Sequence, residues 1–326
     1  MKRISLLLFA WVVCSSAQIF NGGPLTHTYS IVARDTITGE MGVAVQSHWF
    51  SVGSIVSWAE AGVGAVATQS LVNVSFGQRG LDLLRRGKTA GEVLKELLSS
   101  DEGADFRQVA IVDGKGNIAV HTGKKCIAEA GHIIGGNYSV QANMMLNSTI
   151  WPAMSKAFEA ASGPLAERMV AALKAAENQG GDIRGQQSAA VLVVRGQPTG
   201  KIWEDRIIDI RVEDHPDAVD EIERILRVYR AYEHMNKGDL AIEHGDEQAA
   251  LREYSTAGSM FPDNIEMKYW HAVSLVNIGK IESALPMFRS IFEKDSNWIS
   301  LTQRIVENGL LIVDSDQLER IISLRK

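Results

Sequence analysis

The stretch Thr28-Tyr-Ser-Ile-Val-Ala-Arg-Asp-Thr-Ile-Thr-Gly-Glu-Met-Gly-Val-Ala-Val-Gln-Ser47 predicts a β-hairpin around which the rest of the chain is organised. Two β-rich runs, residues 29–33 and 42–45, flank a polar connection with the residue types that form turns, namely Asp35, Thr36, Thr38 and Gly39. The second run is small and apolar on both faces, which is typical of a strand buried between layers. Thr28 places a hydroxyl side chain just before the first strand.

The length of 326 residues, with 45% hydrophobic and 22% charged residues, suits a globular protein of about two domains. Residues 1–17 combine Lys2 and Arg3, an apolar run and Ser-Ser-Ala, the three parts of a secretory signal peptide. We expect cleavage after Ala17 and a secreted or periplasmic protein. The alternative is a lipoprotein acylated at Cys14. It is less favoured because the sequence lacks the small residue that usually precedes such a cysteine. No later apolar run is long enough to cross a membrane, so the cleaved chain is not expected to be transmembrane.

Charge and cysteine content exclude several classes of function. Without the signal peptide, 33 basic residues fall to 31 against 39 acidic ones, a net charge of −8 that argues against nucleic acid as a partner. Cys126 is then the only cysteine, so no intramolecular disulfide can form. The eight histidines show no clustered metal-binding pattern, and no phosphate-binding glycine loop is present, so we expect neither a metal nor a cofactor.

Residues 18–27 are interpreted as a linker or propeptide, and residues 28–216 as a layered domain of sheets and helices. Thr89 and Glu92 form a capping box at the start of one helix. A glycine-rich loop is expected near residues 131–136. Beyond the first hairpin, strands are expected within residues 54–68, 107–123, 189–194 and 207–212, and helices at residues 76–86, 89–98, 150–161 and 165–178.

Residues 217–326 change character and predict an all-helical domain. Two segments align at a period of 34 residues, in which Gly245, Ala250 and Tyr254 correspond to Gly279, Ala284 and Phe288. The pattern of small and aromatic residues is typical of a tetratricopeptide repeat, and the second copy departs from it at several positions. We expect helices near residues 218–232 and 300–311 to cap the two repeats.

Thr28 is the strongest candidate for a catalytic residue because of its position in the chain, not because of its residue type. A threonine at the start of a chain carries its own base, because its α-amino group can take the hydroxyl proton. The alternative is an ordinary threonine at a strand edge. Arg34 and Asp35 are equally consistent with a turn pair, and Arg107, Asp182 and Arg184 with structural ion pairs.

Six ordered motifs together resemble the bacterial family called domain of unknown function 1028 over residues 28–216. They are residues 28–35, 42–47, 61–69, 107–113, 121–123 and 180–190, the last reading Gly-Gly-Asp-Ile-Arg-Gly-Gln-Gln-Ser-Ala-Ala. That family is similar to the N-terminal-nucleophile hydrolases. The resemblance implies an α+β fold, a four-layer α-β-β-α sandwich with two antiparallel sheets between helical layers.

The resemblance also implies roles for individual residues. Thr28 falls where the superfamily has its nucleophile, which requires a second cut between His27 and Thr28, and Thr26 is a competing candidate. Asp35 and Ser47 are expected to assist catalysis, and Asn143 to donate a hydrogen bond to an oxyanion. The expected substrate-binding residues, which could equally tie loops together, are Arg34, Arg107, Asp182, Arg184 and Gln187.

Two hypotheses of function follow. In the first, the exported protein is an amidohydrolase whose Thr28 attacks an amide carbonyl of a small amide or peptide. In the second, the same scaffold is a non-catalytic binding protein whose helical domain contacts a protein, a peptide or peptidoglycan. Association into a homo-oligomer is open under both hypotheses.

Overall fold

The computed structural model describes residues 25–325 as two compact units that divide after Ile222. The predicted signal peptide, the cut after Ala17, Cys14 and residues 18–24 of the predicted linker lie outside the described residues. Among residues 25–325, no helix has the length and apolar character needed to cross a membrane.

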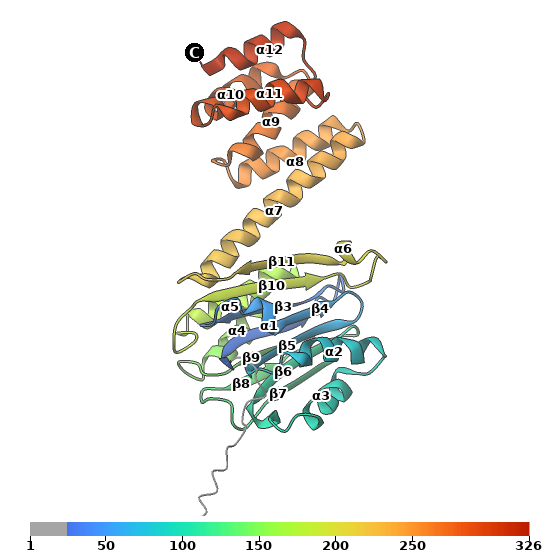
Figure 1. Cartoon of the computed structure of the whole chain (residues 1–326), viewed down its shortest axis with the longest axis vertical. Helices are drawn as coiled ribbons and strands as arrows, with labels where there is room; N and C mark the ends of the chain where they lie inside the picture. Colours follow the sequence, from blue (N-terminus) through green and yellow to red (C-terminus); the bar gives the residue numbers. More distant parts are fainter. Residues whose placement is uncertain (1–24, 326) are drawn as a thin grey trace, which may run out of the picture. The chain divides into compact units, whose positions relative to one another are not determined.

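The first unit contains two antiparallel sheets (Figure 1). One has the strand order β1-β5-β6-β7 with β4 also on β5, and the other the order β11-β10-β3-β2-β9-β8. The first sheet consists of β1 (Leu25–Thr26), β4 (Ser57–Glu60), β5 (Gly64–Leu71), β6 (Arg107–Asp113) and β7 (Ile118–Thr122). The second consists of β2 (Thr28–Arg34), β3 (Met41–Ser47), β8 (Gly131–Ile134), β9 (Tyr138–Ala142), β10 (Ser188–Val194) and β11 (Arg206–Val212).

Helices cover the outer faces of both sheets. Helices α2 (Ser75–Arg85) and α3 (Ala90–Ser99) pack on the first sheet, and α4 (Ile150–Ala160) and α5 (Leu165–Glu177) on the second. Small and β-branched side chains such as Val43 fill the space between the sheets. The unit therefore has the predicted α-β-β-α layers, and the fold prediction is confirmed. Two single-turn helices, α1 (Gly53–Val56) and α6 (Ile202–Asp205), interrupt the connections.

The β2–β3 hairpin lies at the centre of the second sheet, as its sequence predicts. Its register runs from Thr28 opposite Ser47 to Arg34 opposite Met41, and β10 and β9 pair on its outer edges. Alternate residues of β2 face different layers. Tyr29 donates a hydrogen bond to Glu177 of α5, whereas Ser30 donates one to Gln69 of β5, 2.6 Å away. The strand thus ties the helical layer to the opposite sheet.

Two local predictions require correction. The segment expected to be a glycine-rich loop contains strand β8, which pairs with β9 along its whole length. Residues 25–26, expected to be part of a linker, form β1 and pair with Ser70 and Leu71 of β5. The capping box at Thr89 and Glu92 is present at the start of α3 as predicted.

The second unit is all-helical, as predicted. Helix α7 (Ala218–Glu243) begins in the first unit and runs on without a break, so the predicted end near residue 232 was too early. The remaining helices are α8 (Glu247–Met260), α9 (Ile265–Asn277), α10 (Ile281–Lys294), α11 (Asn297–Glu307) and α12 (Ser315–Ile322), followed by a 3₁₀ turn, Ser323–Arg325. Corresponding residues of α8 and α10 are buried, Ala250 with Ala284 and Tyr254 with Phe288. The 34-residue spacing thus places equivalent side chains in the core of the unit.

Candidate active site

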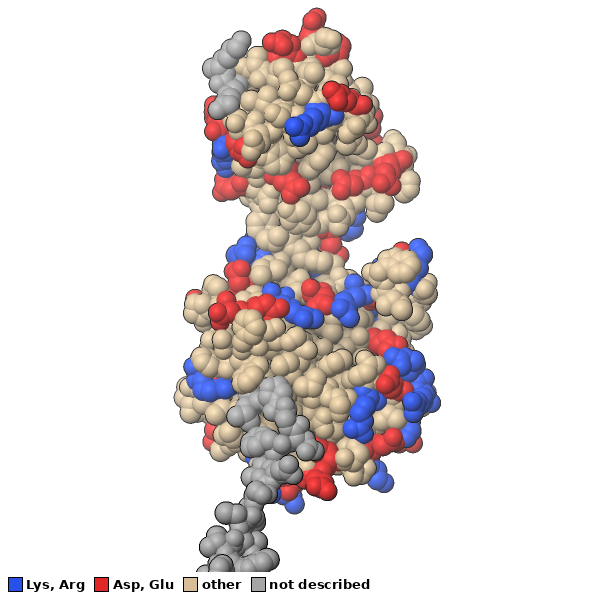
Figure 2. Space-filling model, viewed as in Figure 1, with Lys and Arg blue, Asp and Glu red and all other residues tan. Residues whose placement is uncertain are grey.

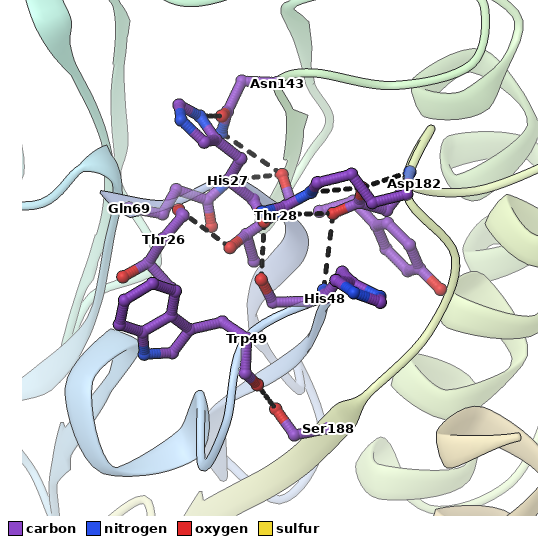
Figure 3. A network of polar contacts seen from close by, with 12 residues as sticks. Thr26, His27, Thr28, His48, Trp49, Gln69, Asn143, Asp182 and Ser188 are labelled. Atoms are coloured by element: carbon purple, nitrogen blue, oxygen red, sulfur yellow. Dashed lines mark hydrogen bonds and ion pairs between the residues drawn. The ribbon is translucent and has the colours of Figure 1, made fainter. Parts of the chain in front are cut away.

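Thr28 lies at the first position of β2 and is completely buried. Its hydroxyl donates a hydrogen bond to the carbonyl oxygen of Thr26, 2.9 Å away (Figure 3). Two hydroxyl residues continue the row across the sheet, because Ser47 of β3 stands opposite Thr28 and Ser188 of β10 stands opposite Ser47. The hairpin therefore brings the predicted nucleophile and Ser47 together at its open end.

The carbonyl oxygen of His27, immediately before Thr28, accepts two hydrogen bonds. Ser47 Oγ donates from 2.5 Å and Arg184 Nη2 from 2.9 Å. Arg184 is fixed by Asp182, whose two carboxylate oxygens accept from its Nε at 3.0 Å and its Nη2 at 2.7 Å. A two-pronged arginine–carboxylate pair of this kind holds the guanidinium group in a defined orientation. The His27 carbonyl is thus polarised by one hydroxyl and one cation.

Asp182 is itself held rigidly. It is 2% exposed, and its Oδ1 accepts a hydrogen bond from the Arg184 backbone N–H at 2.9 Å. The backbone N–H of His48, the residue after β3, donates to its Oδ2 from 3.4 Å. The two residues predicted as either substrate-binding or loop-tying groups therefore tie this loop and also place Arg184 at the His27 carbonyl.

The next carbonyl, that of Thr28, is bound by different groups. Asn143 donates to it from its backbone N–H at 3.1 Å and from Nδ2 at 3.2 Å, and Gln69 Nε2 donates from 3.2 Å. Asn143 Nδ2 also donates to Gln108 Oε1 at 2.9 Å. From the sequence, Asn143 is expected to donate a hydrogen bond to an oxyanion. In the structure it holds the Thr28 backbone, and the donors at the preceding carbonyl are Ser47 and Arg184.

The His27 side chain is enclosed as well, with 3% of its surface exposed. Its Nδ1 lies 2.9 Å from Asn143 Oδ1. Because Asn143 Nδ2 already donates to two oxygens, Oδ1 is the acceptor facing the ring, and the imidazole hydrogen must lie on Nδ1. Burial lowers the pKa of His27, the Asn143 contact opposes this, and the charge of Arg184 lowers it further. The ring is therefore neutral at pH 7.

Four predicted site residues lie outside this cluster. Asp35 and Arg34 lie at the other end of β2, roughly 20 Å from Thr28 at a strand rise of about 3.3 Å per residue, so neither contacts Thr28. Arg107 is paired with Asp101 and donates to the Leu71 carbonyl, which fixes the end of β5. Gln187 reaches the site through its backbone, whose N–H donates to the Ser47 carbonyl at 3.2 Å. The expected direct roles of these four side chains are not supported by their positions.

Asp35 instead organises the hairpin turn. Its Oδ1 accepts hydrogen bonds from the backbone N–H groups of Ile37 and Thr38, both at 2.8 Å. Burial alone would raise the pKa of Asp35, but these hydrogen bonds and the charge of Arg168 lower it. The carboxylate is therefore a structural acceptor.

Three residues of the site were not singled out from the sequence: His27, Gln69 and Gln108. Gln69 and Gln108 are completely buried, and Gln69 Nε2 donates to Gln108 Oε1 at 2.7 Å. The sequence could have identified these two glutamines, since each is a polar residue near the end of a strongly apolar strand, within a motif of the family resemblance. Among residues 25–325, no three His, Cys, Asp or Glu side chains converge as a metal site would require.

The first unit matches a known protein family. The family of unknown function DUF1028 matches residues 28–222. The chain belongs to this family. A crystal structure of the DUF1028 protein SPO2555 from Silicibacter pomeroyi is 29% identical and superposes with a TM-score of 0.56, covering 62% of this chain and 88% of that one. Anbu (ancestral beta-subunit) from Yersinia bercovieri is 15% identical with a TM-score of 0.32, covering 60% of this chain and 92% of that one. No curated protein matches this DUF1028 chain.

Proposed function

We propose that the chain is an amidohydrolase in which Thr28 acts as an N-terminal nucleophile once the bond between His27 and Thr28 is cut. The observation that carries the proposal is the His27 carbonyl, which accepts hydrogen bonds from Ser47 Oγ and Arg184 Nη2 next to a buried threonine. Fixed donors at a carbonyl oxygen stabilise the negative charge that develops when a nucleophile attacks its carbon.

The first reaction is removal of the residues before Thr28. Thr28 Oγ1 attacks the His27 carbonyl carbon, closing a five-membered ring in which the oxyanion lies between Ser47 and Arg184. The bond from that carbon to the Thr28 nitrogen then breaks, the hydroxyl proton passes to the nitrogen, and an ester on Thr28 results. Water hydrolyses the ester, which releases the His27 carboxylate and leaves Thr28 as the first residue with a free hydroxyl and a free amine.

The second reaction uses the new amine as the base. An α-amino group has a pKa of about 8, so a useful fraction is neutral near pH 7 and can accept the Thr28 hydroxyl proton. The nearby Arg184 cation disfavours protonation of the amine. Thr28 Oγ attacks an amide carbonyl, the proton passes to the departing amine, and water hydrolyses the resulting ester.

The test measures amide hydrolysis with a panel of peptide coumarin amides. The parent chain is expected to release the fluorophore, Thr28→Ser to retain part of this activity, and Thr28→Ala to lose it. A Thr28→Ala chain as active as the parent would overturn the proposal, as would a chain that begins at Thr28 and cleaves no amide of the panel. Export, with signal cleavage after Ala17, belongs to the same proposal and is checked by the location of the processed protein in a bacterial host.

A second candidate function, peptide or protein binding by the helical unit, has its own support. A cavity of about 300 Å³ is lined by apolar side chains such as Trp270 and by Asp239 and Glu243. The hydroxyl of Ser274, which also lines it, is buried without a hydrogen-bond partner among residues 25–325. Acidic side chains predominate on the face of this unit shown in Figure 2. We propose that the cavity takes an apolar side chain of a peptide that carries a neighbouring basic residue.

The repeat spacing of α8 and α10 supports the tetratricopeptide interpretation of this unit, and such repeats form extended binding surfaces. The test titrates peptides containing Leu beside Arg into the full chain, with tryptophan fluorescence as the signal. Glu243→Lys is expected to weaken binding, and Glu282→Lys, outside the cavity, to leave it unchanged. Equal binding by both variants would overturn the proposal, and binding of peptidoglycan fragments alone would reassign the surface to the cell wall.

A further inference from the structure

We infer that residues 25–27 occupy the acyl side of the substrate site, and that the substrate is an extended peptide that takes their place on β5. The inference rests on the proposed function, because this place becomes available only when the bond after His27 is cut. Three features carry it: the edge of β5, the enclosure around the His27 ring, and the surroundings of Thr26.

The edge of β5 is divided between two partners. Strand β4 pairs with residues Gly64 to Ala67, and β1 pairs further along with Ser70 and Leu71, while β6 occupies the opposite edge of β5. Removal of β1 therefore leaves Ser70 and Leu71 without a strand partner on this edge of β5, while Ser70 stays paired with Arg107 of β6 on the other edge. An extended peptide can restore such pairing through its own main chain. Arg107 donates to the Leu71 carbonyl and keeps this end of β5 in place.

The His27 position defines a side-chain requirement for the residue at the scissile bond. Its ring is buried, and its one described side-chain hydrogen bond is with Asn143 Oδ1, an acceptor. A substrate side chain at this position must donate a hydrogen bond or leave that oxygen buried without a partner, which is costly. Histidine, asparagine and glutamine meet the requirement, whereas phenylalanine has a similar shape and no donor.

The Thr26 position favours a different residue type. Its side chain is completely buried opposite Ser70, and its Oγ1 has no hydrogen-bond partner among the described residues. Valine has the same shape without the hydroxyl, so it fills the position without burying an unpaired polar atom. The site therefore prefers valine over threonine at the second residue from the scissile bond.

The experiment uses two full-length versions of the described chain, one that begins at residue 28 and one that begins at Leu25, both carrying Thr28→Ala so that no catalysis occurs. The probes are acetyl-Leu-Thr-His, acetyl-Leu-Val-His, acetyl-Leu-Thr-Phe and acetyl-His. Binding is measured by calorimetry, with hydrogen exchange at the Ser70 and Leu71 amides as the readout of strand pairing. Catalytic failure of the proposed function cannot affect either readout.

We expect acetyl-Leu-Thr-His to bind the shorter chain at least tenfold more tightly than the longer one, in which residues 25–27 fill the site. Val in place of Thr should tighten binding about fivefold and Phe in place of His weaken it about tenfold, as for single buried polar groups. Equal binding of acetyl-His and the tripeptides, or of the tripeptides to both chains, would overturn the inference. If the shorter chain is unstable, binding of the same peptides is measured by the rise in Tm that they produce. The absence of a rise with every peptide would also overturn the inference.

Discussion

The two ends of the β2–β3 hairpin use similar side chains for different purposes. At the turn end, Arg168 Nη1 lies 3.3 Å from Asp35, whose other carboxylate oxygen accepts two backbone N–H groups of the turn. At the open end, Arg184 is paired with Asp182 but also donates to the His27 carbonyl, as does Ser47. One arginine–aspartate pair closes a turn, and the other directs a cation at a peptide bond.

One ion pair therefore holds a turn, and the other also contacts the carbonyl at the proposed cleavage site. Burial and charge alone do not distinguish the two pairs, since both carboxylates are largely buried. The third partner distinguishes them: in one case it is a set of backbone N–H groups next to the carboxylate, and in the other it is the carbonyl that precedes Thr28. Substitutions at the open end should therefore change reaction rates, and substitutions at the turn end should change stability.

The largest effect is expected at the His27 carbonyl. Ser47→Ala and Arg184→Gln each remove one donor from the developing oxyanion, and each should slow cleavage before Thr28 about 10²- to 10³-fold. The rate is followed by mass spectrometry of freshly refolded protein. Arg168→Gln is the matched control at the turn end and should leave the rate within about twofold of the parent. A comparable loss in all three variants would mean that the open end has no special role.

The two ends should also respond to acid in different pH ranges. Burial lowers the pKa of His27, so the folded chain binds fewer protons there than the unfolded chain, and its contribution to stability is lost as pH falls below about 6.5. The lowered pKa of Asp35 gives a contribution that is present above about pH 4 and is lost only as pH falls further. Hydrogen exchange in unprocessed Thr28→Ala protein should therefore accelerate first at Ser70 and Leu71, and later at Ile37 and Thr38. Simultaneous loss of protection would contradict the comparison.

A smaller effect is expected from Asp35→Ala. The substitution leaves the turn N–H groups and Arg168 without their acceptor, so the free energy of unfolding should fall by about 1–3 kcal/mol at pH 7. The difference should shrink as the pH falls below about 4 and the parent carboxylate takes up a proton. Urea unfolding measures both values. Cleavage before Thr28 should continue at the parent rate, and a slower rate in folded Asp35→Ala protein would reinstate Asp35 as a residue of the site.

The smallest effect is expected from Gly39→Ala in the same turn. Gly39 has φ of +74°, a conformation that costs a residue with a Cβ about 1 kcal/mol. Its Cβ would meet Gly196 Cα at 3.3 Å, which is tight but not prohibitive. A modest fall in Tm with unchanged cleavage is the expected result, measured by thermal unfolding. Gly87→Ala is a matched control, since it has a similar φ of +86° with open space around its Cβ.

Much of the fold could be predicted from the sequence because its strongest signals are local. Alternating and continuous apolar runs located the hairpin, and the Thr89 capping box located the start of α3. The missed strand β8 has a physical cause. Its Gly131 lies against the Trp151 ring, where a Cβ would come within 2.6 Å, so this glycine marks close packing and not a loop.

The site could be predicted only in part, because it is built from the ends of segments far apart in the sequence. Ser47, Asp182 and Arg184 were named among the candidates, but which carbonyl they serve depends on the pairing of β1 with β5. Asp35 was expected to assist catalysis because of the family resemblance, as a residue at the end of the strand that begins at Thr28. An extended strand of seven residues separates the two by roughly 20 Å, and this distance was sufficient to exclude contact.

The most direct test of the account is the intact mass, with N-terminal sequencing, of the purified parent chain and of Thr28→Ala after the same incubation. The account predicts that the parent begins at Thr28 and that Thr28→Ala keeps residues 25–27. A parent chain that retains residues 25–27 indefinitely would contradict it, because Thr28 would then have no free amine to act as a base. Identical cleavage in both proteins would contradict self-processing by the Thr28 hydroxyl.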